Sequence, residues 1–355
     1  MKRGEWGNKR NMKEMKKVLV ALSGGVDSSA AAVLLRQQGY HCDGAMLQLL
    51  PSGNDTADAE AVARRLGMEF YSLEARGPFA DGVMDRFVAE YCAGRTPNPC
   101  IRCNERVKFG LLLDYALEHG YDYLATGHYA RIERDGEGIA HLLRGRDRSK
   151  DQSYVLCRLT QHQLSHLLLP LGSVDKPYAR QVTQEAGLLN ADRVDSQDIC
   201  FIPDGDYIAF LEREGVELRG GNFIDEEGSV LGQHRGLPCY TIGQGKGLGI
   251  ALGRHVYVLG KNAANNTVTL GDNDRLFTHT LTAGEVNWLS GSAPQGALRC
   301  SAKTRYSQTE AAATAQMLPD GRLQLTFDEA QRAITAGQAV VLYDGEEVLC
   351  GATIE

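Results

Sequence analysis

The sequence contains no long apolar run. No hydrophobic stretch approaches the ~18 residues that a membrane-spanning helix needs, so we expect no membrane partner. The first 17 residues carry seven lysines and arginines against two glutamates, but no apolar stretch follows them as in a secretory signal peptide. We therefore expect a cytoplasmic protein in which residues 1–16 form a disordered basic leader, or in which the native start is Met12 or Met15.

Disulfide and zinc signatures are missing too. The chain has nine cysteines, and an odd number in a chain without a secretory signal argues against a disulfide framework. Cys100 and Cys103 form the one Cys-x-x-Cys pair, and no second pair stands at the spacing of a structural zinc site. Most of the other cysteines are expected to be small, buried apolar residues.

Acidic residues are absent from a long stretch of the second half. Residues 228–271 contain no Asp or Glu but include Arg235, Lys246, Arg254 and Lys261. Two shorter segments, 144–150 and 299–305, are also rich in Lys and Arg. Although the net charge is −7, these three segments predict a polyanion-binding surface if the fold brings them together. The alternative is that each is a solvated loop.

A glycine-rich loop near the start carries the clearest chemical signal. Ser23–Ser29 reads S-G-G-V-D-S-S and lies between an apolar run, residues 18–22, and a helical pattern, residues 30–38. A strand that turns through glycines into a helix directs backbone N–H groups at an anion. The loop lacks the Gly-Lys-Ser/Thr ending of P-loop hydrolases and resembles the loop of ATP pyrophosphatases, which adenylate an oxygen of their substrate. Asp27 is predicted either to bind Mg²⁺ or to cap the helix.

The pattern of apolar residues changes along the chain. The first half alternates strand-like and helix-like segments, which predicts a doubly wound α/β fold around a parallel sheet over residues 17–205. Glycine-rich residues 206–277 predict a small central domain. Short alternating segments at 297–304, 322–327, 339–343 and 348–354 predict a small β-barrel or sandwich over residues 278–355.

Thiol chemistry is suggested by the segment that contains Cys103. Two prolines precede this cysteine and disfavour helix, so we expect a helix over residues 105–119 with Cys103 near its N-terminus. A helix N-terminus lowers the pKa of a thiol and favours the reactive thiolate. A second cysteine, Cys200, lies in the polar segment 195–202 and is expected either to meet this pair or to be a core thiol.

Together, seven motifs make the chain resemble the bacterial tRNA-specific 2-thiouridylases of the ATP pyrophosphatase superfamily, which convert the wobble uridine, position 34, of certain tRNAs to 2-thiouridine. The motifs are Ser23–Ser29, Gly94–Asn104, Ala125–Ala130, Lys150–Tyr154, Ser196–Cys200, Tyr240–Gln244 and Arg305–Tyr306. The resemblance spans nearly the whole chain after the leader. It implies an ATP pyrophosphatase domain, a small central domain and a C-terminal β-barrel, with ATP and Mg²⁺ as cofactors and tRNA as substrate.

The resemblance also implies a role for individual residues. Catalysis would involve Cys103 as nucleophile, Cys200 as sulfur carrier, Asp27 and Cys100. ATP would be bound by Ala21, Leu22, Ser23, Gly24, Gly25, Val26, Asp27, Ser28, Met46 and Gly127. The target base would be contacted by Asn98, Pro99 and Cys100, and other parts of the tRNA by His128, Lys150, Asp151, Gln152, Arg305, Tyr306 and Gln338.

Two residues depart from the family pattern. Many members have Asp where this chain has Cys100, so the three thiols Cys100, Cys103 and Cys200 can be the ligands of a 4Fe–4S cluster that holds sulfide on its open iron. The competing route uses a persulfide on Cys200 and a transient disulfide with Cys103. The sulfur would come from a sulfur-relay protein, a cysteine desulfurase or free sulfide. Many members also have Arg where this chain has Gly245, which removes one expected phosphate contact.

Two other functions are alternatives to tRNA thiolation. A synthetase that adenylates a small metabolite would share the glycine-rich loop, but it would need neither Cys103 nor Cys200. A non-catalytic RNA-binding or iron-storing scaffold would need no intact loop with Asp27. Salt-sensitive tRNA binding separates the first alternative from tRNA thiolation, because phosphate contacts make affinity fall steeply with salt.

Overall fold

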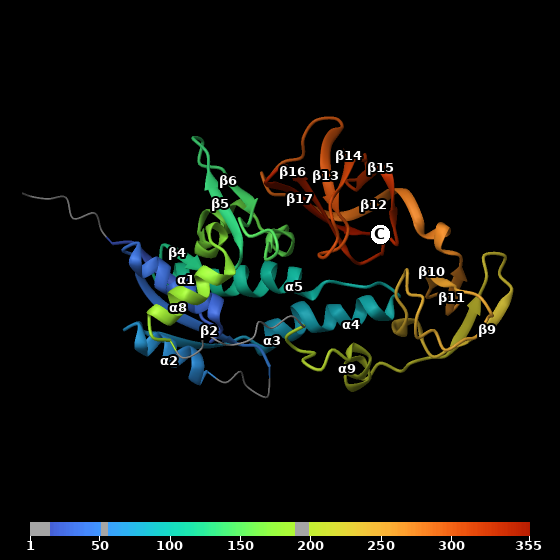
Figure 1. Cartoon of the computed structure of the whole chain (residues 1–355), viewed down its shortest axis with the longest axis horizontal. Helices are drawn as coiled ribbons and strands as arrows, with labels where there is room; N and C mark the ends of the chain where they lie inside the picture. Colours follow the sequence, from blue (N-terminus) through green and yellow to red (C-terminus); the bar gives the residue numbers. More distant parts are fainter. Residues whose placement is uncertain (1–14, 51–55, 189–198) are drawn as a thin grey trace, which may run out of the picture.

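The computed structural model of the chain describes residues 15–50, 56–188 and 199–355. Figure 1 shows three parts: a helix-flanked sheet from the N-terminal half, a barrel of C-terminal strands, and a small sheet at the far end. Within the described ranges, no helix combines the length and apolar character needed to cross a bilayer. The leader expected over residues 1–16 lies outside the described residues except for its last two.

Five parallel strands form the N-terminal sheet in the order β3-β2-β1-β4-β7. They are β1 (Lys17–Ala21), β2 (His41–Gln48), β3 (Phe70–Glu74), β4 (Tyr123–Ala125) and β7 (Leu167–Leu168). Successive strand residues point to opposite faces, and in β1 Val18 and Val20 join one core cluster whereas Leu19 joins another. All three are fully buried, so both faces are covered, and the predicted α/β class is confirmed.

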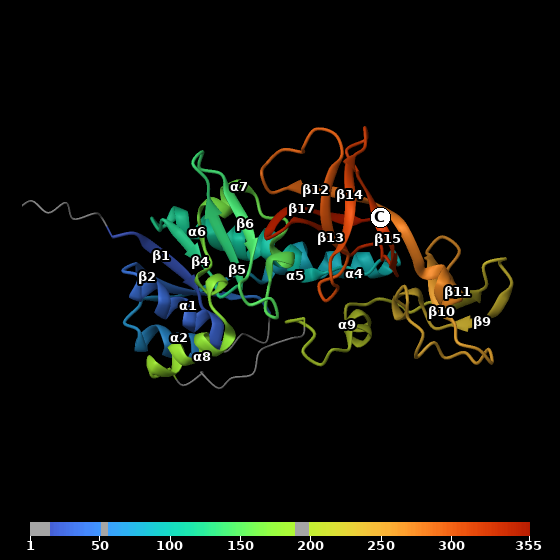
Figure 2. The same cartoon turned by 45° about the horizontal axis from the view of Figure 1, so that its top comes forward.

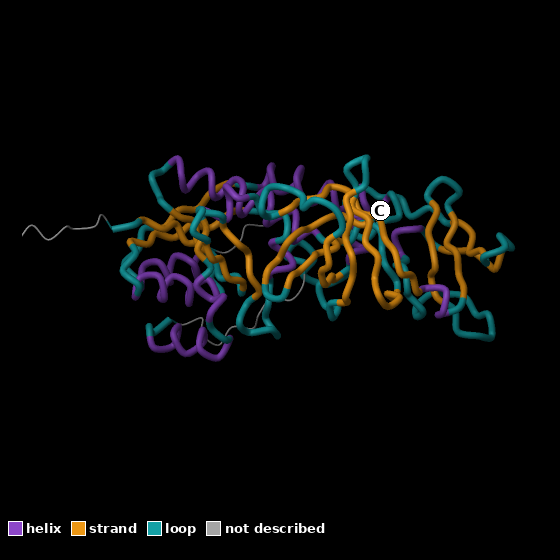
Figure 3. Tube along the Cα trace, turned by 90° about the horizontal axis from the view of Figure 1, so that it is seen from above, coloured by secondary structure: helices purple, strands orange, loops and turns teal. Residues whose placement is uncertain are grey.

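Helices gather around this sheet, whereas strands dominate the rest of the molecule (Figure 3). The helices α1 (Val26–Gln37), α2 (Ala57–Arg65) and α8 (Lys176–Glu185) belong to this part, together with the short segments η3 (Ser153–Leu156), α7 (Gln161–Ser165) and η4 (Pro170–Ser173). Helix α1 packs against α8, which brings the start of α8 near the glycine-rich loop.

Two long helical runs extend from the sheet to lie under the barrel (Figure 2). The first joins α3 (Arg76–Phe79), η1 (Ala80–Met84) and α4 (Asp85–Cys92), and the second joins α5 (Pro99–Arg102), η2 (Cys103–Leu111) and α6 (Leu112–Glu118). The expected start near Glu105 is therefore wrong. Pro99 occupies the first helical position, where its missing N–H is harmless, and the Asn98 side chain caps the helix by accepting from the Cys100 amide at 3.1 Å.

A hairpin that the sequence did not predict, β5 (Ala130–Arg134) with β6 (Ala140–Arg144), joins the two halves of the molecule. Strand β6 pairs with β17 (Glu347–Ile354) of the barrel. The barrel itself contains β12 (Phe277–Trp288), β13 (Leu298–Lys303), β14 (Ala311–Met317), β15 (Leu323–Arg332) and β16 (Ala339–Asp344). It closes because β12 pairs with both β15 and β17, so a barrel is correct and a sandwich is not.

The central domain is small and built on one sheet in the order β10-β11-β8-β9. Its elements are α9 (Tyr207–Arg213), β8 (Gly221–Ile224), β9 (Val230–His234), η5 (Leu237–Cys239), β10 (Tyr257–Asn262), β11 (Thr267–Gly271) and η6 (Asn273–Leu276). Phe223, Val258 and Val268 are fully buried and form the centre of its core.

Candidate nucleotide and thiol site

The glycine-rich loop leaves β1 at the carboxyl edge of the sheet, between β2 and β4. Met46 lies on β2, and Gly127 follows β4, so the residues expected at the ATP site come to one edge. A Cβ atom on Gly127 would lie 2.6 Å from the Asp27 carbonyl carbon and 2.8 Å from the Ser28 nitrogen. Only glycine permits this close approach, which makes Gly127 part of the wall of the loop.

The loop itself is shaped to expose its N–H groups. Gly24 has φ of 73°, a left-handed conformation that favours glycine. Ser28 Oγ accepts from the Ser23 amide at 3.2 Å and also lies 3.2 Å from Ser23 Oγ. The N-cap of α1 is Gly25, with no side-chain cap, so Asp27 does not cap the helix and that alternative is excluded.

Asp27 instead belongs to a buried network that the sequence did not predict. Lys176 Nζ lies 2.8 and 2.9 Å from the two Asp27 carboxylate oxygens, and the Tyr129 hydroxyl donates to Asp27 Oδ1 at 2.8 Å. Lys176 is only 7% exposed and opens helix α8. A basic residue at a helix start is unusual because the helix dipole disfavours it there, and this is the one signal in the sequence that could have drawn attention to Lys176. The loop thus holds a cation beside its N–H groups.

The structure brings Cys100, Cys103 and Cys200 into one region. Cys200 directly precedes Phe201, whose ring packs 5.7 Å from Phe79, 5.4 Å from Phe87 and 5.1 Å from Phe210, measured between ring centroids. This aromatic cluster anchors Cys200 on the helical run that lies beside Cys103. The thiols are close enough that Cys100 and Cys103 both raise the pKa of Cys200. Ser196–Asp198, also part of the predicted motif, lie outside the described residues.

The expected low pKa of Cys103 is wrong. Burial raises the pKa of the Cys103 thiol, and Cys100 adds to the increase. Desolvation by the surrounding protein also raises the pKa of Cys100 and raises that of Cys200 to about 11. Both residues nevertheless keep part of their surface exposed to solvent. Cys103 lies in the second turn of a helix that starts at Pro99, and desolvation there outweighs any effect of the helix dipole.

Lys108 is the cation that opposes this effect. Its charge lowers the pKa of Cys100, Cys103 and Cys200. Cys103 and Lys108 lie in η2, a π-helix, in which hydrogen bonds join residues five apart. The π-helix therefore places Lys108 one turn beyond Cys103 on the same face, where an ordinary α-helix would turn it away.

Replacing Lys108 with methionine should raise the pH at which Cys103 becomes reactive. The reason is that removing a cation raises the pKa of a neighbouring thiol, and burial already holds the pKa of Cys103 above its ordinary value. The rate of iodoacetamide labelling of Cys103 against pH, followed by peptide mass spectrometry, measures the change. Arg106→Met, at an exposed position of the same helix, is the control. A lower midpoint in Lys108→Met would mean that the pocket had opened instead.

Residues expected to contact tRNA surround these thiols. Tyr306, from the barrel, donates from its hydroxyl to the Asp151 carbonyl at 3.1 Å, and Cys100 lies close enough to contribute to the raised pKa of Tyr306. The Gln338 side chain donates to the Thr96 carbonyl at 2.7 Å. The barrel and the segment before Cys100 thus meet at the predicted tRNA contacts.

Three of the residues predicted to contact tRNA make hydrogen bonds within the protein. Gln152 Oε1 accepts from the Tyr129 amide at 3.0 Å, and the Asp151 carboxylate accepts from the Gly145 amide at 2.9 Å. The Arg305 guanidinium donates to the Thr335 hydroxyl at 2.6 Å. These residues shape the surface as well as lying on it, and their contacts with tRNA stay a prediction.

His128 links the two halves of the site. It follows Gly127, its Nδ1 lies 2.7 Å from the Thr126 hydroxyl, and its ring centroid lies 5.6 Å from that of Phe109. Burial, assisted by Lys108, lowers the pKa of His128 to about 3. The ring is therefore neutral at physiological pH, and any contact with tRNA is through hydrogen bonding or stacking.

The three basic segments contribute less free charge than their composition suggested. Arg254 is paired with Asp272, Arg299 with Asp328, and Arg148 with Glu346. At Gly245, a Cβ atom would lie 2.7 Å from the Tyr257 ring, so an arginine there requires that ring to move. The tyrosine ring explains locally why this position is glycine.

Comparisons with known proteins identify the family of the chain. Three family models match consecutive parts of the chain: a tRNA methyl transferase HUP domain over residues 16–204, a tRNA methyl transferase PRC-barrel domain over 208–272, and an aminomethyltransferase β-barrel domain over 278–354. The tRNA-specific 2-thiouridylase MnmA of Magnetococcus marinus is 44% identical, covering 97% of this chain and 100% of that protein. The chain belongs to the tRNA-specific 2-thiouridylase family.

Other 2-thiouridylases agree at similar levels. The MnmA of Moorella thermoacetica is 47% identical over 352 residues, with 95% of this chain and 99% of that protein covered. A solved structure, the U34-tRNA thiolase NcsA from Methanococcus maripaludis with its 4Fe–4S cluster, gives a TM-score of 0.34 at 18% identity, covering 56% of this chain and 66% of that chain. That likeness is too partial to bear on the cofactor of this 2-thiouridylase.

Proposed function

We propose that this chain catalyses the ATP-dependent 2-thiolation of the wobble uridine, position 34, of tRNA. One observation carries the proposal: the nucleotide loop and the thiols are joined through adjacent residues. Gly127 packs on Asp27 of the loop. The charge of Lys108 acts on the pKa of both His128, which follows Gly127, and Cys103. These contacts support a site in which a sulfur nucleophile serves the same substrate as a loop suited to nucleotide phosphates. A tRNA substrate places the enzyme in the cytoplasm.

Adenylation is the first step. The target base leaves the anticodon stack to enter the site, where uridine O2 attacks the α-phosphorus of ATP, N3 loses its proton and pyrophosphate departs. The N–H groups at the start of helix α1 and the Lys176 ammonium stabilise the departing charge. The carboxylate oxygens of Asp27 are ligands of the kind that Mg²⁺ prefers, and Mg²⁺ held there would neutralise further charge on the phosphates.

Sulfur transfer follows, because adenylation has made O2 a leaving group. The terminal sulfur of a persulfide on Cys200 attacks C2, the C2–O2 bond breaks, and AMP leaves with the oxygen. The Cys103 thiolate then attacks Cys200 Sγ, so the bond between Cys200 and the transferred sulfur breaks and its electron pair stays on the base, which regains the N3 proton. The resulting Cys103–Cys200 disulfide is reset by a dithiol reductant. A persulfide-carrying protein or a cysteine desulfurase supplies the sulfur.

A 4Fe–4S cluster on Cys100, Cys103 and Cys200 does not fit the thiols as they are placed. Among residues 15–50, 56–188 and 199–355, no three His, Cys, Asp or Glu side chains come close enough together to hold a metal ion. No step is therefore assigned to a cluster, and Cys100 is assigned to the target base. Its exposed position next to Tyr306 supports that assignment.

The test is a reconstituted reaction with anaerobically purified protein, unmodified tRNA, Mg-ATP and a protein persulfide donor. We expect 2-thiouridine by nucleoside mass spectrometry, with one AMP and one pyrophosphate released per thiolated tRNA. A tRNA with cytidine at the wobble position is the control, and it should give no thiolated nucleoside and no release of AMP or pyrophosphate. ATP cleavage that responds to a small carboxylate but not to tRNA would contradict the proposal, and thiolation that requires bound iron would contradict the persulfide route.

A further inference from the structure

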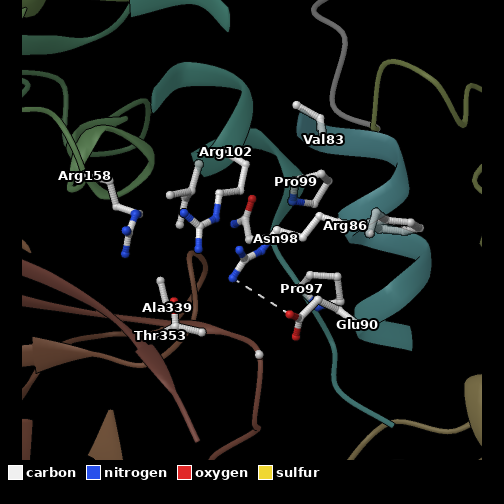
Figure 4. Close-up of a pocket in the computed structure, with 13 residues that line it drawn as sticks. Val83, Arg86, Glu90, Pro97, Asn98, Pro99, Arg102, Arg158, Ala339 and Thr353 are labelled. Atoms are coloured by element: carbon white, nitrogen blue, oxygen red, sulfur yellow. Dashed lines mark ion pairs between the residues drawn. The ribbon is translucent and has the colours of Figure 1, made fainter. Parts of the chain in front are cut away.

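A narrow pocket lies between the helix carrying the thiols and the barrel. Figure 4 shows Arg86, Arg102 and Arg158 converging on it from the helical side, with Ala339 and Thr353 on the barrel side. Three guanidinium groups in one pocket repel one another unless carboxylates separate them. The barrel supplies one such carboxylate, that of Glu285.

Glu285 has an unusual backbone. It lies in β12 with φ of 48°, at an irregularity in the pairing with β17 between Gly284 and Asn287. A left-handed conformation at a residue other than glycine is unfavourable and persists only where the surroundings enforce it. Here the Glu285 carbonyl accepts from Arg158 Nη1 at 2.6 Å, which fixes the bulge against the helical side.

The Glu285 side chain makes three more contacts. Its carboxylate accepts from Arg86 Nη2 at 2.8 Å, from Arg102 Nη2 and from the Thr353 hydroxyl at 2.8 Å. Burial works to raise the pKa of the Glu285 carboxyl, but Thr353 and the two arginines outweigh it and lower the pKa to about 2. The carboxylate is thus charged at every pH at which the enzyme works.

Arg102 connects this cluster to the chemistry. It lies between Cys100 and Cys103 in the sequence, and its side chain is only 12% exposed. Its two terminal nitrogens are divided between Glu285 of the barrel and Glu105 of its own helix, the latter at 2.8 Å. Glu105 in turn accepts from Arg158 at 3.2 Å. The orientation of the helical turn with both thiols is therefore tied to the position of the barrel.

We propose that Glu285 is a positioning residue for sulfur transfer, which holds the Cys100–Cys103 turn in register with the barrel through Arg102. The inference rests on the proposed function, although Glu285 itself touches none of the residues assigned to ATP or to the target base. The barrel also carries Arg305 and Tyr306, the predicted tRNA contacts. Docking of tRNA on the barrel and alignment of the nucleophile are then parts of one rigid arrangement.

The decisive variant is Glu285→Gln, with Asp328→Asn as the matched control. Asp328 forms a two-pronged ion pair with Arg299 on the same barrel, at 2.8 Å for each contact, but does not touch the helices. In Glu285→Gln we expect kcat for thiolation to fall by ~10- to ~100-fold, the scale of a small misplacement of a reacting group. The KM of Glu285→Gln for tRNA should stay near the wild-type value. The thermal midpoint of unfolding of Asp328→Asn should also stay near that of the wild type. Glu285→Asp, which keeps the charge and tolerates a left-handed backbone, should recover part of the loss.

A second readout does not depend on activity. Mild oxidation should form the Cys103–Cys200 disulfide more slowly in Glu285→Gln than in wild type, because the turn that bears Cys103 is less fixed. If Glu285→Gln is too unstable to assay, Thr353→Val removes one hydrogen bond without removing the charge and should change both readouts in the same direction by a smaller amount. Equal cross-linking rates in all variants would overturn the positioning role. If the variants form the Cys103–Cys200 disulfide more slowly, as expected, but the wild-type protein thiolates no tRNA, the proposed function is overturned and the positioning role is not.

Discussion

Replacing Lys176 with methionine should reduce tRNA-dependent formation of AMP by ~100- to ~1000-fold, the range seen when one preorganised group that stabilises transition-state charge is removed. The ammonium sits 2.8 Å from Asp27 Oδ1, beside the N–H groups of the loop. When it is absent, the departing pyrophosphate loses the one side-chain cation that is paired with Asp27 beside the loop. The rate is measured by AMP release from labelled ATP in the presence of tRNA.

Tyr129→Phe is the matched control for this variant. It removes a neutral donor to the same Asp27 oxygen but leaves the cation in place, so its loss should be small by comparison. Binding of tRNA in a filter assay should be unchanged in both variants. Equal AMP formation by Lys176→Met and wild type would show that the ion pair only supports the fold.

In a reaction without added reductant, Cys103→Ser should release no 2-thiouridine while leaving a single turnover of ATP cleavage. Without the second thiol, the adduct that joins Cys200, the transferred sulfur and C2 of the uridine has no internal nucleophile to release it. We therefore expect a covalent enzyme–tRNA complex on denaturing gels, in an amount matching the AMP released, that an added thiol reductant converts to 2-thiouridine.

Cys92→Ser controls for the loss of an exposed thiol. Cys92 ends helix α4 and is exposed, but it belongs to no part of the site, so this variant should turn over normally. Continued turnover by Cys103→Ser would remove Cys103 from the chemistry. A complete loss of AMP formation in the same variant would mean that the cysteine acts before sulfur transfer.

The sequence was most informative where a function depends on neighbouring residues. The loop from Ser23 to Ser29 could be interpreted because strand, glycines and helix follow one another directly. Prediction of the helix start failed because Pro99 was interpreted as disfavouring helix, although proline is favourable at the first helical position. The pKa of Cys103 was predicted in the wrong direction because burial depends on the whole fold.

The ion pair at the loop was not predictable from the sequence. Lys176 meets Asp27 across 149 positions, and no local pattern connects them. Two barrel strands were also missed for local reasons. Strand β14 contains four alanines, a residue depleted in strands, and the left-handed Glu285 interrupts β12.

The central claim is that uridine O2 is adenylated at the loop and then displaced by sulfur. It is tested most directly with tRNA that carries oxygen-18 at O2 of the wobble uridine, in a reaction with unlabelled ATP and water. We expect the AMP released with each 2-thiouridine to contain the oxygen-18 in its phosphate. Unlabelled AMP, with the heavy oxygen lost to water or retained in the tRNA, would contradict it.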